Sequence, residues 1–174
     1  SNNSVAIGHQ AGYTDQSNNS VAIGHAAGHT GQKMGSVSIG QSAGYTTQGG
    51  NSVAIGNSSG RTTQGNSSVA IGNNAGNQNQ SLNSVAIGNG AGQTSLGANS
   101  VAIGPNTECQ NNNSVALGSG AKTTANNQIV LGTASETVKI PGILEGYLSG
   151  SNVSPQIHLS IDFAPPGSSY LGRY

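Results

Sequence analysis

Ser4-Val5-Ala6-Ile7-Gly8 is the stretch that decides the fold, because its pattern returns along the whole first part of the chain. Later copies start at Ser20, Ser36, Ser52, Ser68, Ser84, Ser100 and Ser114, and a looser copy spans residues 128–132. The starts lie 16 residues apart six times and then 14 apart twice. A short fixed period that carries one strand is typical of a β-solenoid. We therefore predict an all-β, parallel stack of about nine coils, one for each copy.

Val5 and Ile7 lie two residues apart, so in an extended strand their side chains share one face. Both positions hold branched aliphatic residues in every copy, ending with Ile129 and Leu131. Such side chains stack well from rung to rung. We predict that these two columns fill a narrow core.

The residue between them is small in every 16-residue copy and points to the opposite face. A face in contact with water is expected to carry polar residues and to vary along the chain. A face kept flat over eight rungs is most simply buried against another copy of the chain, so we predict an oligomer interface there. Its residues are Ala6, Ala22, Ser38, Ala54, Ala70, Ala86, Ala102 and Ala116.

The rest of each unit predicts turns and one further short strand. Glycine closes every copy, as at Gly8, where a positive φ is favourable, and asparagine opens most of them, as at Asn3. A second small column, which includes Ala27, is predicted to face the Val and Ile columns across the core, and a Thr column follows it. We expect strand, turn, shorter strand and polar loop in each coil, with a tighter loop in the 14-residue units.

The repeat ends after Gly132, which divides the chain into a β-roll domain over residues 1–132 and a C-terminal cap or connector over 133–174. Residues 137–140 favour one more strand. A further half-buried strand is predicted where apolar residues alternate with polar ones, at Ile157, Leu159, Ile161 and Phe163. These four residues are our candidates for a joint between subunits. Because the chain opens almost inside a strand, we expect a processed product or a fragment.

Composition excludes several classes of protein. The chain has 174 residues, 33% of them hydrophobic and 6% charged, with five acidic and five basic side chains. This balance argues against a nucleic-acid partner, which a basic stripe would indicate. No apolar run approaches the ~18 residues of a membrane span, so we expect no membrane insertion in this chain. Cys109 is the single cysteine, which excludes an intrachain disulfide.

Residue spacing offers little to catalysis or to cofactors. The carboxylates are scattered, and no Ser-His-Asp or Cys-His arrangement recurs, so we predict no enzyme, no catalytic residues and no cofactor. His9 and His25 share a column and make a metal conceivable, but that column continues as Gln41 and Asn57, as a solvated position would. We predict no metal. The Thr column raises ice binding, although Gln78 interrupts it.

The position after the second glycine varies more than any other. Variation on a regular scaffold is a place where recognition can lie, and the alternative is a solvated loop under no constraint. The candidates for receptor contact are Tyr13, His29, Tyr45 and Arg61.

The Asn-Ser-Val-Ala-Ile-Gly units, with Ala or Ser three residues after the glycine, resemble the head repeats of YadA-like trimeric autotransporter adhesins over about residues 1–132. The same repeat occurs in fibres of phages and large viruses. The resemblance implies a left-handed parallel β-roll, three chains side by side, and adhesion to host or matrix surfaces. The small column would then line the threefold contact.

These observations predict a non-enzymatic, extracellular adhesin head or fibre, exposed on a cell or virion surface. It would be a homotrimer that attaches to a host surface or matrix component through its outer loops. The alternative is a structural filament subunit, in which the C-terminal module joins further copies end to end.

Overall fold

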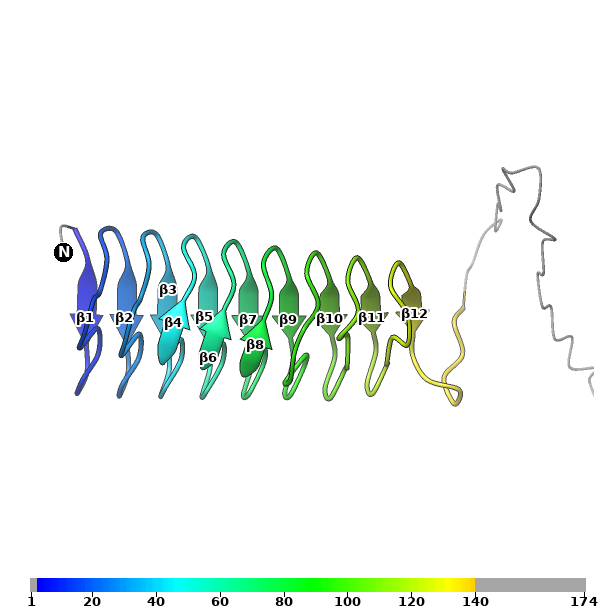
Figure 1. Ribbon diagram of the computed structural model, residues 1–174. Coiled ribbons are helices and arrows are strands. Elements are labelled where there is room, and N and C mark those ends of the chain that lie inside the picture. Colours follow the sequence, from blue (N-terminus) through cyan, green and yellow to red (C-terminus); the bar gives the residue numbers. More distant parts are fainter. Residues whose placement is uncertain (1–2, 140–174) are drawn as a thin grey trace, which may run out of the picture. The chain divides into compact units, whose positions relative to one another are not determined.

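The computed structural model describes residues 3–139, and these form a stack of coils that lengthens by one rung per sequence repeat (Figure 1). The chain divides into two compact units, Ser1–Val138 and Lys139–Tyr174, and the stack of coils belongs to the first. Within residues 3–139 every strand is three residues long and no helix is present. The predicted all-β, parallel solenoid is confirmed.

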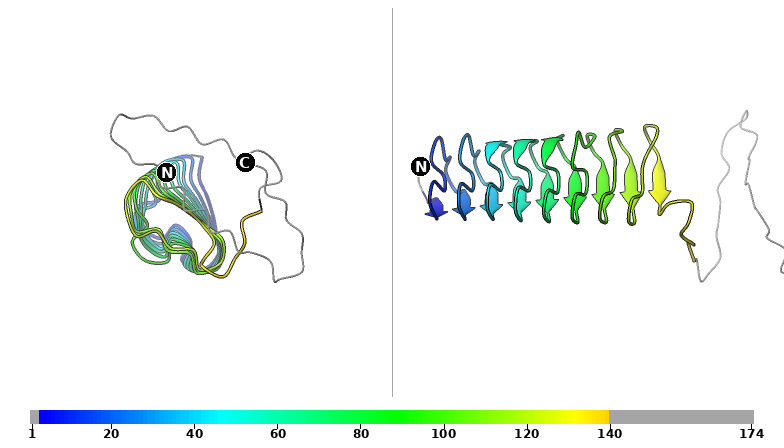
Figure 2. Two further views of the ribbon diagram at one scale, coloured as in Figure 1. Left: turned by 90° about the vertical axis from the view of Figure 1, so that its right-hand side faces the viewer. Right: turned by 90° about the horizontal axis from the view of Figure 1, so that it is seen from below.

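One parallel sheet of nine strands runs along the whole stack. Each Val pairs with the Val of the next rung and each Ile with the next Ile, as in the register Val53↔Val69 and Ile55↔Ile71. Viewed along the stack, the coils nearly superpose (Figure 2). In spatial order the strands are β1 (Val5–Ile7), β2 (Val21–Ile23), β3 (Val37–Ile39), β5 (Val53–Ile55), β7 (Val69–Ile71), β9 (Val85–Ile87), β10 (Val101–Ile103), β11 (Val115–Leu117) and β12 (Ile129–Leu131).

The second strand of the coil is confirmed in the middle of the stack, although it is as long as the first and not shorter. It forms a second parallel sheet of β4 (Thr46–Gln48), β6 (Thr62–Gln64) and β8 (Gln78–Gln80). Single bridges extend this ladder toward the N-terminus through Thr14 and Thr30, and by one rung to Thr94.

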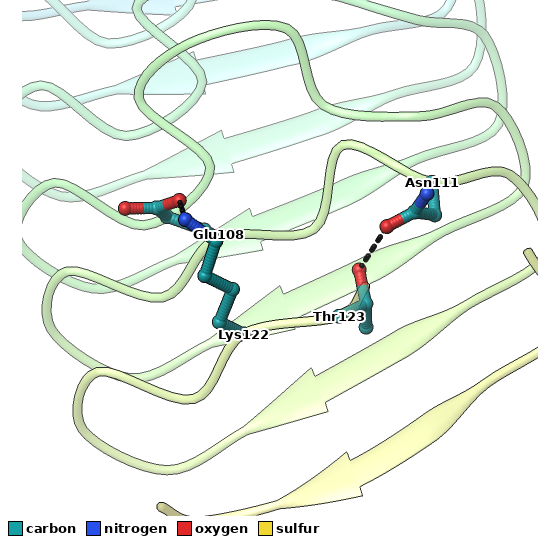
Figure 3. Close-up of polar contacts among 4 residues, drawn as sticks. All are labelled: Glu108, Asn111, Lys122 and Thr123. Atoms are coloured by element: carbon teal, nitrogen blue, oxygen red, sulfur yellow. Dashed lines mark hydrogen bonds and ion pairs between the residues drawn. The ribbon is translucent and has the colours of Figure 1, made fainter. Parts of the chain in front are cut away.

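In the 14-residue coils, side-chain contacts join neighbouring rungs on the side of the coil that carries β4, β6 and β8 in the 16-residue coils (Figure 3). The Lys122 ammonium lies 2.6 Å from the Glu108 carboxylate, and the Thr123 hydroxyl donates to the Asn111 side-chain oxygen at 3.0 Å. Glu108 and Lys122 also share a backbone bridge, which is the only one on this side of the coil after Thr94 among residues 3–139.

The two faces of the main sheet are reversed relative to the prediction. The small column points into the coil, and Ala22, Ser38, Ala54, Ala70, Ala86, Ala102 and Ala116 are all 0% exposed within a single chain. Ala6 is exposed because β1 has a neighbouring strand on one side only. The Val and Ile columns point outward. The predictions that Val and Ile fill the core, and that the small column is an oligomer interface, are therefore wrong.

The thinness of the coil explains the reversal. A Cβ built on Gly28 would lie 3.3 Å from the Cβ of Ala22, and one on Gly44 would lie 2.3 Å from the hydroxyl of Ser38. The interior at this level has room for methyl and hydroxymethyl groups but not for branched aliphatic ones. The second small column shares this interior: Ala75 and Ala91 belong to the same buried cluster as Ala70 and Ala86.

Much of the interior is polar, which the sequence reasoning missed. In four of the six 16-residue coils, one buried glutamine reaches across and donates its amide N–H to the carbonyl of the strand's Val at 2.7 to 2.8 Å; these are Gln32, Gln48, Gln64 and Gln80. The serine that opens the strand is buried too in every coil from β2 to β11. Ser36, for example, donates its hydroxyl to the carbonyl of Lys33 at 2.6 Å. The spacing of these glutamines, 16 residues apart, was the signal available in the sequence.

We expect Ala22→Ser and Ala54→Ser to stabilise the fold by about 1 kcal/mol each. The buried side-chain oxygens of Gln32 and Gln64 have no hydrogen-bond partner, whereas that of Gln48 accepts from Ser38 at 2.6 Å. The new hydroxyls would occupy the position of Ser38 in their own coils. Urea denaturation measures the change.

Ala86→Ser is the matched control for this prediction. The residue ten positions later in that coil is Leu96, which offers no acceptor, so the buried hydroxyl is expected to destabilise the fold. Equal effects from all three variants would contradict the role given to the glutamines.

The strand-closing glycine is required by both its φ and its surroundings. Gly56 has φ +124°, and a Cβ there would lie 2.6 Å from the carbonyl oxygen of Gly72 in the next rung. The asparagine that opens the strand adopts φ between 53° and 59° in each of Asn3, Asn19, Asn51, Asn83, Asn99, Asn113 and Asn127. The side chains of these asparagines also form a short ladder, in which Asn83 donates to Asn99 and Asn99 to Asn113, each at 3.2 Å.

After β12 the chain leaves the sheet through a turn at residues 133–136. The Thr133 hydroxyl and then its backbone N–H donate to the Glu136 carboxylate, and they lower the pKa of this carboxyl. Residues 137–139 form no strand, and the rest of the strand predicted at 137–140 lies outside the described residues. The subunit-joint candidates Ile157, Leu159, Ile161 and Phe163 also lie outside them, so the end-to-end joint stays a prediction.

Candidate interaction surfaces

The outward side of the nine-stranded sheet carries an apolar face, formed by the Val, Ile and Leu side chains at the first and third position of each strand. Exposure is 42% for Val5, 57% for Ile7, 36% for Ile71, 44% for Leu117, 71% for Ile129 and 46% for Leu131, and the other members are half-buried. An exposed apolar surface of this length and regularity is typical of a protein–protein contact.

The four candidates for receptor contact form one continuous stack across four rungs. The rings of Tyr13 and His29 stack with centroids 5.2 Å apart, and those of His29 and Tyr45 with centroids 4.7 Å apart. The Arg61 guanidinium carbon lies 5.4 Å from the centroid of the Tyr45 ring. The 16-residue period places each side chain above the previous one. The structure thus brings together residues that the sequence had grouped only as a variable column.

After Arg61 the next member of this column is Asn77, which begins a chain of hydrogen-bonded side-chain amides that runs back to Gln41. Asn77 donates to Asn74 at 3.2 Å and Asn74 to Asn73 at 2.9 Å. Asn73 then donates to Asn57 at 3.4 Å and Asn57 to Gln41 at 3.0 Å. Because these bonds cross between columns, the columns of Tyr13, Gln10 and His9 lie side by side. We call this surface the polar face.

The described residues also contain a histidine pair and a polar hollow. His9 and His25 stack with centroids 5.3 Å apart, and no group of three or more His, Cys, Asp or Glu side chains that could hold a metal occurs within residues 3–139. A polar hollow lies where 16-residue coils give way to 14-residue coils, lined by Gly90, Gly92, Gln93, Thr94, Asn106, Thr107 and Glu108. Its one carboxylate, Glu108, pairs with Lys122.

No helix of the described part of the chain is both long enough and apolar enough to cross a membrane. Cys109 is buried and its thiol lies 3.4 Å from the carbonyl of Ser114.

The fold and the repeat define a parallel β-roll repeat protein. The family model described as the YadA head domain repeat matches two copies, over residues 62–75, 94–108 and 110–135. Among solved structures, the chain is similar to the crystal structure of the collagen-binding domain of the Yersinia adhesin YadA, with 26% identity and a TM-score of 0.55. This similarity covers 88% of the present chain and 93% of the Yersinia domain. A search of curated protein sequences gives no match.

The resemblance to YadA-like head repeats predicted from the Asn-Ser-Val-Ala-Ile-Gly motif is therefore confirmed.

Proposed function

We propose that the chain is an adhesin-type head: a non-enzymatic, extracellular homotrimer that attaches a surface to a matrix component through its polar face. The observation that carries the proposal is the division of one rigid roll into two kinds of exposed surface. The apolar face is the same on every rung, whereas the polar face changes from rung to rung. A constant face suits assembly and a varied face suits recognition.

Assembly through the apolar face needs only further copies of the same chain. Every copy carries the same nine rungs of Val, Ile or Leu at the same spacing, so copies packed in register match each apolar rung with another. The interface proposed here replaces the small column, which is buried inside the coil. Three chains side by side is the arrangement that the family resemblance implies, and a closed ring of identical contacts leaves no apolar face open.

Recognition through the polar face fits its composition. Tyr, His, Arg and Asn supply stiff aromatic contacts and adaptable hydrogen bonds, the combination found in binding surfaces built on a rigid scaffold. The residues proposed for contact are Tyr13, His29, Tyr45 and Arg61. The Yersinia domain is described as collagen-binding, which makes collagen the first matrix component to test.

Attachment is expected to depend on the stack in the polar face. The double variant His29→Ser/Tyr45→Ser removes the two central members, and we expect about a tenfold weaker attachment to whichever of several immobilised matrix proteins, collagen first, the native chain binds. Gln78→Ser is the control, because Gln78 is exposed on β8 outside the three columns. Failure of the native chain to attach to any matrix-coated surface would contradict the proposed function.

A further inference from the structure

Arg61 is an isolated positive charge on a nearly uncharged roll. Before residue 105 the formal charges are Asp15, Lys33 and Arg61 alone. Within residues 3–139 the one ion pair is that of Glu108 with Lys122, so Arg61 has no carboxylate partner there. Its guanidinium is exposed and lies over the Tyr45 ring. This cation–π contact positions the guanidinium on the polar face while leaving its N–H groups available.

The backbone around Arg61 is already engaged in bonds between rungs. Its carbonyl accepts from the N–H of Thr46 at 2.8 Å. On either side, the N–H of Gly60 donates to Ala75 at 2.9 Å and that of Thr62 to Asn77 at 2.8 Å. An extended peptide therefore finds no free strand edge here, and strand addition is excluded as a binding mode at this face. Any ligand of this face would therefore be bound by side chains.

The side chains beside Arg61 suit a ligand rich in hydroxyl groups. The Tyr45 phenol lies in the preceding rung, and the side-chain amides of Asn57 and Asn73 are exposed on the same polar face. Phenol and amide groups both donate and accept hydrogen bonds, as a sugar hydroxyl does. Guanidinium binds carboxylate and other oxyanions with two parallel hydrogen bonds.

We propose that the polar face binds an acidic polysaccharide, with a carboxylate or sulfate of the sugar chain on Arg61 and its hydroxyls on the neighbouring phenol and amide groups. This inference rests on the proposed function, since it names the class of matrix component that the head takes. In a trimer the three polar faces could bind one polysaccharide molecule together, with an avidity greater than the affinity of one face.

The test measures binding of the full chain to immobilised chondroitin sulfate, which carries sulfates and carboxylates, to hyaluronan, which carries carboxylates only, and to neutral dextran. Arg61→Gln is expected to weaken binding tenfold or more, because a charge-assisted hydrogen bond is lost at each face. Lys33→Gln removes the same charge from a different column of the 16-residue coils and is expected to leave binding unchanged. Binding to hyaluronan as well as chondroitin sulfate assigns a carboxylate, and binding to chondroitin sulfate alone assigns a sulfate.

Equal weakening by Arg61→Gln and Lys33→Gln would overturn the proposal, because it would show a general effect of net charge. Equal binding to dextran would overturn it as well. If the native chain attaches to collagen but to neither acidic polysaccharide, this inference fails and the proposed function stands. If the native chain attaches to no surface at all, both fail.

Discussion

Ala70→Glu is expected to unfold the coils around β7, with a loss of about 4 kcal/mol or more in the free energy of unfolding. Ala70 is fully buried in the cluster that includes Ala75 and Ala86. A Cβ on the facing Gly76 would already lie 3.4 Å from the Cβ of Ala70, so a glutamate has neither the space nor a partner for its charge. The loss is measured by urea denaturation followed by circular dichroism.

Two further variants separate charge from size in this experiment. Ala70→Val adds volume without charge and is expected to cost about 1 to 3 kcal/mol through overpacking. Gln78→Glu adds the same charge to an exposed site on β8 and is expected to change stability by less than about 0.5 kcal/mol. An Ala70→Glu chain with native stability would show that this column does not face the interior.

The sequence was sufficient to predict the rungs, because the spacing of Ser4, Ser20 and Ser36 leaves one register for the strands. It was not sufficient to decide which face of each strand is inside. Val69 and Ala70 alternate in any extended strand, and a core of Val and Ile satisfies that alternation as well as a core of Ala does. The deciding quantity is the width of the coil.

That width depends on residues in the left-handed region, which no hydrophobic pattern encodes. Ala26 and Ser42 have φ of 54° and 55°, although neither is a residue that usually adopts this conformation. They bring the second segment of the coil close to the strand, leaving space for small side chains and for one glutamine. The interior is then covered by atoms of the same chain, and the Val and Ile side chains of the strands are left outside.

The alignment of the variable column was better predicted than the orientation of the strands, for a related reason, and its role in receptor contact stays a prediction. A 16-residue period aligns Tyr13, His29, Tyr45 and Arg61 whatever the width of the coil. Their stacking follows from the rung spacing of about 4.8 Å, close to the separation at which rings pack. The hydrogen bonds from Asn77 to Asn74 and from Asn74 to Asn73 depend on how the turn places neighbouring columns, which the sequence pattern does not give. The extent of the polar face was therefore not predicted.

Val69→Glu is expected to leave the coils folded and to break the proposed trimer. Val69 points outward on β7 beside the partly exposed Ile71, so a monomer can keep the carboxylate in water. In the trimer, the same substitution would bury one carboxylate per chain against apolar side chains, at a cost of several kcal/mol for each. Sedimentation equilibrium is expected to give the mass of one chain where the native protein gives three, with an unchanged circular dichroism spectrum.

The comparison with Ala70→Glu makes this test specific, because the two altered residues are neighbours in the same strand. Loss of assembly with retained fold at Val69, and loss of fold at Ala70, is the pair of results that the orientation of β7 requires. Val69→Ile keeps the face apolar and is expected to retain the native mass. A Val69→Glu protein that still sediments as three chains would place the interface on some other surface of the roll, and the apolar face would then need a different occupant.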